Sequence, residues 1–163
     1  MKRWRHTLLV LVTIATCAGC DQVTKAVAKS TLSPGRVVTF AADTVRLQMT
    51  ENAGAFLSLG ASWPASIRQM IFTIGAGIVV GAIALYALAD TRGGVARAVA
   101  LALISGGGLS NLFDRVTYGG HVVDFLNIGV GTLRTGIFNV ADMGVMAGVV
   151  LLLMSVRSGA RNV

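Results

Sequence analysis

The sequence predicts an all-α membrane protein with four transmembrane helices and a small extracytoplasmic β-sheet. Hydrophobic residues make up 54% of the 163 residues and charged residues only 13%, with a mean hydropathy of +0.72. Several stretches approach the roughly 20 apolar residues that a helix needs to cross a bilayer. They are hydrophobic on all sides rather than along one stripe, which is typical of helices surrounded by lipid. We therefore expect a single membrane domain over residues 1–163.

Four stretches are predicted to span the bilayer. The clearest is 68–89, because no charge interrupts it after its first residue. The stretch 96–113 is shorter and reaches the interface only when flanking residues are included. The stretch 136–156 is long enough but contains Asp142. The first stretch, 7–28, needs a separate argument because a charged residue lies inside it.

Residues 7–20 form an apolar run that ends at Ala18-Gly19-Cys20, the pattern at which a bacterial lipoprotein export signal is cut. By length this run fits a signal-peptide core better than a span. Extended to Ala28 it crosses the bilayer, provided that Asp21 faces protein. We favour the extension because most of the chain after Cys20 is itself membrane segment, and because Cys17 stands where a lipoprotein signal carries a large aliphatic residue. The alternative is a membrane-tethered lipoprotein lipidated at Cys20.

Basic residues predict the orientation in the membrane. The net charge is +7, but no run of five basic residues occurs, so we expect contact with membrane lipid and not with nucleic acid. In the four-span order, one face collects the short basic ends and the short connection. These basic residues are Lys2, Arg3, Arg5, Arg92, Arg97, Arg157 and Arg161. The distribution favours cytoplasmic termini and long outer loops.

The first outer loop, about 29–67, is expected to carry structure of its own. Residues 36–40 and 44–49 are rich in β-branched side chains and alternate in polarity, and residues 41–43 separate them as a turn. We therefore predict a small sheet. Trp63-Pro64 is predicted to be an interfacial anchor before the second span.

Seven polar or charged residues are expected at one depth, near the outer ends of the spans. Charges at membrane depth are unfavourable by a few kcal/mol each, and those that a chain retains usually face one another or a wet cavity. The shared depth therefore predicts a polar site at the outer edge of the bundle. The seven residues are Asp21, Asn111, Asp114, Arg115, Asp124, Asn139 and Asp142.

Helical spacing directs two groups of these residues to one place. Asn111, Asp114 and Arg115 stand at positions i, i+3 and i+4, which share one helical face. Asn139 and Asp142 share a face in the same way at the start of the fourth span. Two helices would thus aim polar faces at one point.

Each acid also has a purely structural explanation. Asp124, in the loop between the third and fourth spans, would be a solvated acid, and Asp142 would be favourable at the positive end of a helix. Arg115 would neutralise Asp114 as an interfacial pair. His121 beside Asp124 is a weak metal signal, and we expect no metal. A small proton or ion carrier would also bury acids, but nearer the midplane of the bilayer.

Five blocks of the sequence carry a resemblance to a known family. In order along the chain, they resemble the motif blocks of lipoprotein signal peptidase (signal peptidase II). The blocks are Asp21-Gln-Val-Thr-Lys25, Asn52-Ala-Gly54-Ala-Phe56, Gly106-Gly-Gly-Leu-Ser-Asn111-Leu-Phe-Asp114-Arg115, Gly120-His-Val-Val-Asp124-Phe125 and Phe138-Asn139-Val-Ala141-Asp142.

The resemblance implies an aspartic endopeptidase whose catalytic carboxylates are Asp124 and Asp142. It also implies an outer β cradle, no cofactor, and a prolipoprotein substrate that is cut before a diacylglyceryl-modified cysteine. We expect a monomer in the bacterial inner membrane with its active site near the outer face. The residues that match supporting or substrate-contacting positions are Asp21, Lys25, Asn52, Gly54, Asn111, Arg115 and Asn139.

Two positions depart from the family pattern. The family commonly has two alanines between Gly54 and the aromatic residue, where this chain has Ala55 alone before Phe56, and it usually has glycine where this chain has Ser110. Neither departure touches the acids. Two carboxylates close together in a pocket of low dielectric constant share a proton, which supplies one base and one acid. We also expect Asn52 and the cradle strands to receive the carbonyls of an unwound substrate helix.

Overall fold

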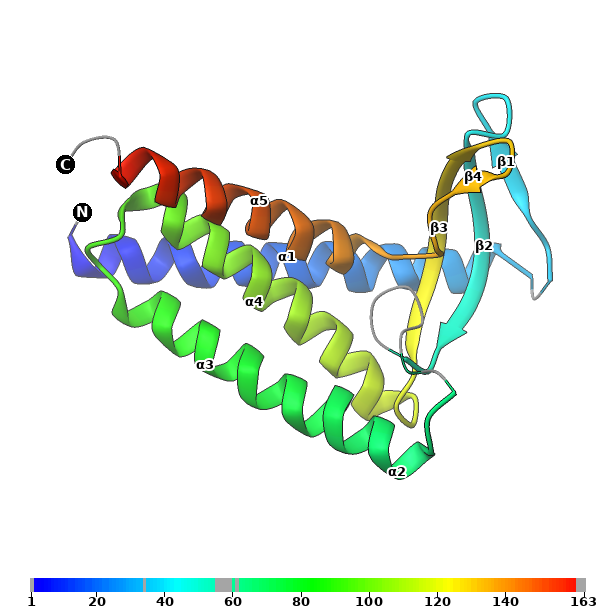
Figure 1. Cartoon of the computed structure of the whole chain (residues 1–163), viewed down its shortest axis with the longest axis horizontal. Helices are drawn as coiled ribbons and strands as arrows, with labels where there is room; N and C mark the ends of the chain where they lie inside the picture. Colours follow the sequence, from blue (N-terminus) through cyan, green and yellow to red (C-terminus); the bar gives the residue numbers. More distant parts are fainter. Residues whose placement is uncertain (1, 34, 55–59, 61, 161–163) are drawn as a thin grey trace.

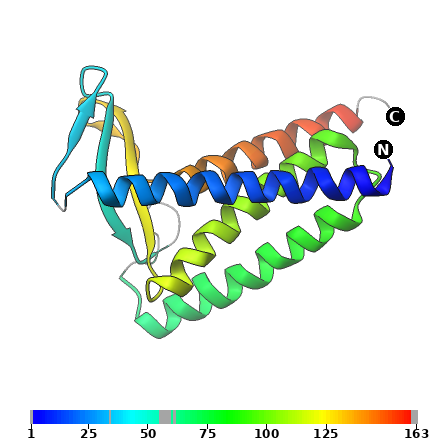
Figure 2. The same cartoon turned by 180° about the vertical axis from the view of Figure 1, so that it is seen from behind.

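A bundle of helices with a sheet across one end makes up the protein in a computed structural model that describes residues 2–33, 35–54, 60 and 62–160. Figure 1 shows the helices side by side and the strands running across their ends. The start of α1 and the end of α5 lie at the other end of the bundle (Figures 1 and 2). In chain order the elements are α1 (Arg3–Thr31), β1 (Val38–Phe40), β2 (Val45–Asn52), α2 (Ala65–Arg68), η2 (Gln69–Gly75), α3 (Ala76–Ala89), α4 (Gly94–Thr117), β3 (Val122–Val130), β4 (Leu133–Arg134) and α5 (Val140–Ala160).

Three helical runs in the described part of the chain are long and apolar enough to cross a membrane. They are α1, the continuous run Ala65–Ala89 and α4, and they contain the whole of the predicted spans 7–28, 68–89 and 96–113. At 29 residues, α1 is about 44 Å long and so extends beyond a bilayer core of about 30 Å. The predicted limits were too narrow because charged residues at both ends continue the helix outside the apolar segment.

The fourth helix starts later than the predicted 136–156. α5 begins at Val140, and its apolar part, Val140–Ser155, is shorter than the other three. Residues 136–138 instead connect the sheet to the helix, and Phe138 forms a β-bridge with Leu126. The start was misplaced because this connection is as apolar as a span.

The run before α3 is not a regular α-helix. Its segment η2 is a π-helix, in which each backbone hydrogen bond spans five residues instead of the four of an α-helix. Phe72, in the middle of η2, stacks on Trp63 with ring centroids 5.8 Å apart and an interplanar angle of 10°. The residue pattern did not predict the π-helix, because widening a turn leaves the apolar composition unchanged.

The centre of the bundle is α4, which packs against α1, α3 and α5. Glycines allow these close approaches. A methyl group on Gly148 would lie 2.6 Å from Ala100 O, and one on Gly106 would lie 2.9 Å from Ile14 O. Such contacts let helix backbones touch directly, as small residues do in membrane bundles.

The antiparallel sheet has the strand order β1-β2-β3-β4. The predicted strands 36–40 and 44–49 correspond to β1 and β2, and the predicted turn between them is present. Ala41, Ala42 and Asp43 all have positive φ there, and Asp43 accepts hydrogen bonds from Arg46. The C-terminal end of α1 packs against the sheet through Ala28 and through Leu32, the residue that follows the helix.

The longest strand was not predicted. β3 spans nine residues where a loop carrying Asp124 was expected. Its first four residues are all buried, so the alternation of apolar and polar residues that marks a half-exposed strand is missing. β3 pairs with β2 from Asn52↔Val122 to Val45↔Ile128, with an irregularity between Leu47 and Thr50.

Gly148→Ala should destabilise the bundle by about 1–3 kcal/mol, because the added methyl group meets the Ala100 carbonyl and Ile104. The matched control is Gly81→Ala in α3, where an added methyl group has nothing within 4 Å and helix propensity improves. Thermal unfolding in detergent should therefore shift down for the first variant and not for the second. Equal shifts would contradict the proposed α4–α5 packing.

Candidate active site

The first turn of α5 is closed by a reciprocal pair of hydrogen bonds. The side-chain oxygen of Asn139 accepts from the Asp142 N–H at 2.9 Å, and Asp142 Oδ2 accepts from the Asn139 N–H at 3.2 Å. This arrangement is a capping box, which satisfies N–H groups that a helix leaves unpaired at its start. The amide of Asn139 is oriented by it, so its NH₂ group points away from α5.

The same NH₂ group contacts a second carboxylate. Asn139 Nδ2 donates to Asp124 Oδ1 at 2.7 Å and lies 3.3 Å from Val123 O. Asn139 is fully buried and Asp124 is 2% exposed. The structure therefore brings the two predicted acids, Asp124 and Asp142, onto one buried asparagine.

Asp124 is held from its other side by the neighbouring strand. It pairs with Thr50 in the register of β2 and β3, and Asn52 lies two residues further along β2. Asn52 Nδ2 donates to Asp124 Oδ2 at 3.0 Å, and Asn52 Oδ1 accepts from the Gly54 N–H at 2.9 Å. The sheet thus places an acid over the start of a helix, and Asp124 is not a solvated loop residue.

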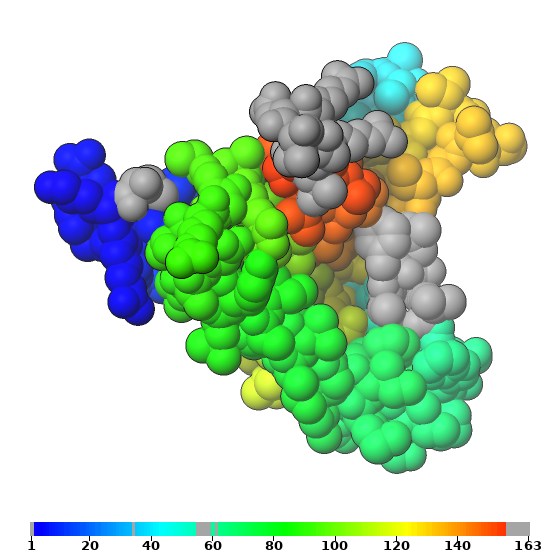
Figure 3. Space-filling model, turned by 60° about the vertical axis from the view of Figure 1, so that its left-hand side comes forward, coloured from blue at the N-terminus to red at the C-terminus, as the bar shows by residue number. Residues whose placement is uncertain are grey.

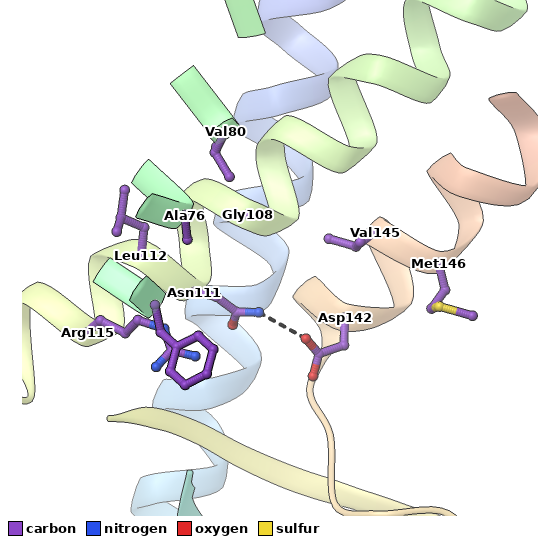
Figure 4. Close-up of a pocket in the computed structure, with 10 residues that line it drawn as sticks. Ala76, Val80, Gly108, Asn111, Leu112, Arg115, Asp142, Val145 and Met146 are labelled. Atoms are coloured by element: carbon purple, nitrogen blue, oxygen red, sulfur yellow. Dashed lines mark hydrogen bonds between the residues drawn. The ribbon is translucent and has the colours of Figure 1, made fainter. Parts of the chain in front are cut away.

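Asn111 approaches Asp142 from α4. Its Nδ2 donates to Asp142 Oδ1 at 2.9 Å, and its Oδ1 accepts from Asn139 Nδ2 at 3.1 Å and from Lys25 Nζ at 3.1 Å. Figure 4 shows the Asn111 side chain directed at Asp142. Because Lys25 can only donate, it fixes which end of the Asn111 amide faces the carboxylate.

Lys25 belongs to a buried ionic cluster beneath the two acids. Lys25 Nζ lies 2.6 Å from Asp21 Oδ2 and 2.8 Å from Asp114 Oδ2, and all three side chains are at most 3% exposed. Asp21 Oδ1 also accepts from the Ala141 N–H at 2.8 Å, which ties α1 to the first turn of α5. Asp21 faces protein, as the predicted first span requires.

Asp114 was missing from the predicted set of site residues, although it was expected at the same depth. The alternative explanation, in which Arg115 only neutralises Asp114, does not hold, because Asp114 pairs with Lys25. Positions i and i+3 of one helix place Asp114 on the face of Asn111. That spacing was the available signal, but an arginine next in sequence was the simpler partner.

Arg115 instead binds backbone carbonyls. Its NH2 group donates to Gly54 O at 2.7 Å and its NH1 group to Gly120 O at 3.1 Å. Its guanidinium lies 5.6 Å from the centre of the Phe72 ring. Arg115 therefore connects α4, η2 and the segment after β2. The predicted contacts of Ala55 and Phe56 lie outside the described residues.

Two apolar cavities meet at Asp142. One, of about 390 Å³, lies between α3, α4 and α5, and Asn111, Arg115 and Asp142 form its polar end. Figure 3 shows the surface recessed between α3 and α5, and Figure 4 shows Val145 and Met146 on the α5 side. The other, of about 420 Å³, lies between α5 and the end of the sheet and is lined by Arg134 and Met143.

Burial raises the pKa of Asp124 to about 6. The Asp142 carboxylate also raises this pKa, whereas the hydrogen bonds from Asn52 and Asn139 lower it. Asp124 therefore holds a proton at higher pH than an ordinary aspartate. A protonated carboxyl beside an ionised one is the arrangement that general acid–base catalysis requires.

His121, the weak metal candidate, directs Nδ1 at Tyr118 O at 3.1 Å. No group of three His, Cys, Asp or Glu side chains suited to a metal ion occurs within the part of the chain that the structure describes. The chemistry that these residues offer is that of paired carboxylates.

Comparison with known proteins identifies the family of the chain. The family described as signal peptidase (SPase) II matches residues 13–157. The lipoprotein signal peptidase of Rhodococcus jostii (strain RHA1) is 32% identical over 157 residues, covering 92% of this chain and 73% of that protein. The lipoprotein signal peptidase of Mycobacterium avium (strain 104) is 35% identical over 157 residues, covering 92% and 79%.

A solved structure also shares the fold. A bacterial membrane enzyme matches with a TM-score of 0.80 and 25% identity, covering 94% of this chain and 90% of its own. Because the family match runs from the first helix to the last, the alternatives of a tethered lipoprotein and of an ion carrier are not favoured. The chain therefore belongs to the lipoprotein signal peptidase (signal peptidase II) family of membrane proteases, which remove signal peptides from prolipoproteins.

Proposed function

We propose that this protein is an aspartic endopeptidase in which Asp124 and Asp142 cut a prolipoprotein before its diacylglyceryl-modified cysteine. The observation that carries the proposal is that both carboxylates contact the same buried asparagine, Asn139, where two apolar cavities meet. An apolar signal helix and lipid chains need such cavities. Cleavage needs two acids that differ in protonation.

We assign the two acids different roles from their surroundings. Both carboxylates accept N–H bonds on both oxygens, but only Asp142 also lies at the positive end of a helix, α5, which favours its ionised form. Asp124 lies on the strand, and burial raises its pKa to about 6. Asp142 is therefore the base, and Asp124 carries the shared proton.

The reaction follows from these roles. Asp142 removes a proton from water as the water oxygen attacks the scissile carbonyl carbon, and Asp124 gives its proton to the carbonyl oxygen. In the collapse of the tetrahedral intermediate, Asp142 returns its proton to the amide nitrogen and Asp124 recovers its own. The C–N bond breaks, which yields the carboxyl end of the signal peptide and the free amino group of the lipidated cysteine.

The surrounding polar residues hold the acids in place. Asn52 and Asn139 orient Asp124, and Asn111 with Asn139 orients Asp142. The role of Asn52 as a partner for substrate carbonyls stays a prediction, and without substrate its NH₂ group binds Asp124. Arg115 lines the cavity between α3, α4 and α5 and holds the segment at Gly54.

We further propose a location for the enzyme. The sheet, whose strand β3 carries Asp124, and the start of α5, which carries Asp142, lie at one end of the bundle, opposite the start of α1 and the end of α5 (Figure 1). With basic termini in the cytoplasm, the acids lie at the outer face of the bacterial inner membrane. The protein acts there as a monomer in contact with lipid.

Asp124→Asn and Asp142→Asn should each reduce cleavage of a diacylglyceryl-modified prolipoprotein by at least about 10³-fold, because an amide is neither base nor acid. A gel-shift assay measures this loss. The control is Asp43→Asn, which alters an acid of the sheet that pairs with Arg46, and it should cleave like the wild type. Substantial turnover by either asparagine variant at the dyad would refute the assignment.

Asn139→Ser should keep the helix cap of α5 but remove the contact that Asn139 makes with both acids. Serine also caps helices, so the thermal midpoint should fall little, but it cannot reach both carboxylates. We expect the turnover rate to fall about 10²-fold with little change in the amount of folded protein. A variant with full activity would show that the bridge between the acids is dispensable.

Stability should also depend on Asp124. Because its pKa is raised from 3.8 to about 6, the folded state binds more protons than the unfolded state in this window, and stability falls as pH rises through it. The loss amounts to about 3 kcal/mol. Thermal midpoints measured from pH 4 to 7.5 should therefore decline less for Asp124→Asn than for the wild type. Parallel curves would contradict the raised pKa.

A further inference from the structure

Ser110, in α4, lies inside the ionic cluster of Asp21, Lys25 and Asp114. Its side chain is 1% exposed. The hydroxyl donates to Asp21 Oδ2 at 2.7 Å and accepts from Gln22 Nε2 at 2.9 Å. A glycine at this position would make neither bond.

The cluster needs donors other than Lys25. Two carboxylates, Asp21 and Asp114, share one ammonium group, and Lys25 gives its remaining N–H to Asn111. A buried carboxylate is unfavourable unless further donors bind it. Neutral N–H and O–H groups must therefore stabilise the excess negative charge.

Each acid of the cluster has two such donors. Asp114 accepts from Gln22 Nε2 at 2.8 Å and from the Val123 N–H at 3.1 Å. Asp21 accepts from Ser110 Oγ and from the Ala141 N–H. The serine hydroxyl thus supplies half of the neutral donors on Asp21.

Asp21 is linked to Asp142 by two routes. Through Ala141, it holds the first turn of α5, the turn that carries Asp142. Through Lys25 and Asn111, it reaches Asp142 Oδ1 by hydrogen bonds of 3.1 and 2.9 Å. A shift of the Asp21 carboxylate would change both routes.

We propose that Ser110 is a positioning residue for catalysis, whose hydroxyl holds Asp21 so that Lys25, Asn111 and the first turn of α5 keep Asp142 in its reactive place. The proposal rests on the proposed role of Asp142. Ser110 touches neither acid of the dyad and acts through Asp21.

The kinetic test compares Ser110→Ala with Ser105→Ala. Ser105 is a fully buried serine of the same helix whose hydroxyl donates to Leu101 O at 2.8 Å within α4. With a diacylglyceryl-modified prolipoprotein, Ser110→Ala should lower kcat by about 3- to 30-fold and leave KM within about twofold. Ser105→Ala should leave both unchanged. An unchanged kcat, or a change in KM alone, would overturn the proposal.

A second measurement does not depend on activity. Amide hydrogen exchange in the first turn of α5, at Ala141 and Asp142, should be faster in Ser110→Ala than in wild type and Ser105→Ala. Equal exchange in the three proteins would overturn the positioning role. If wild type does not cleave the substrate, the proposed function fails while exchange still decides whether Ser110 holds this turn.

Discussion

The polar end of the bundle depends on the reciprocal hydrogen bonds between Asn139 and Asp142. A helix leaves N–H groups unpaired at its start, and burying them inside a membrane protein is unfavourable by several kcal/mol unless a partner is supplied. The partner here is a side chain of the site itself. Since the cap uses the oxygen of Asn139, its NH₂ group is left to bind Asp124 on the strand. One requirement of helix formation thus brings two acids together.

Three elements, β2, α4 and α1, hold the two acids in place, and each one fixes a different part of the site. Asn52 of β2 holds the Asp124 carboxylate, and Asn111 of α4 orients the Asp142 carboxylate. Asp21 of α1 holds the first turn of α5 through the Ala141 N–H. α4 packs closely on α1 and α5, the helices that carry Asp21 and Asp142. Burial of Asp124 lowers the free energy of unfolding near neutral pH. Such a loss of stability is common where a residue serves catalysis.

Much of the architecture was predictable from the sequence because lipid imposes a simple rule. A segment that crosses a bilayer must be long and apolar, and three of the four predicted spans match helices that satisfy this rule. Helical spacing also predicted that Asn111 and Asp142 would face one place, and the structure joins them directly. The family resemblance supplied the pairing of the acids, which spacing alone left open.

The remaining features depend on contacts that no local pattern encodes. β3 was missed because both of its faces are buried at its start, and the π-helix η2 was missed because composition does not report a turn's width. Lys25 was not identified as the partner of Asp114, because it lies 89 positions earlier in the chain and reaches Asp114 only after α1 packs on α4. Sequence neighbours were the wrong guide to ionic partners in a buried site.

The most direct test of the account is to count the protons held by the two acids. Carboxyl carbon NMR of aspartate-labelled enzyme should show Asp124 and Asp142 titrating as a coupled pair that holds one proton near pH 5, with the upper midpoint close to 6. Replacing either acid by asparagine should abolish the coupling. Two independent titrations near 4, unaffected by loss of the other acid, would contradict it.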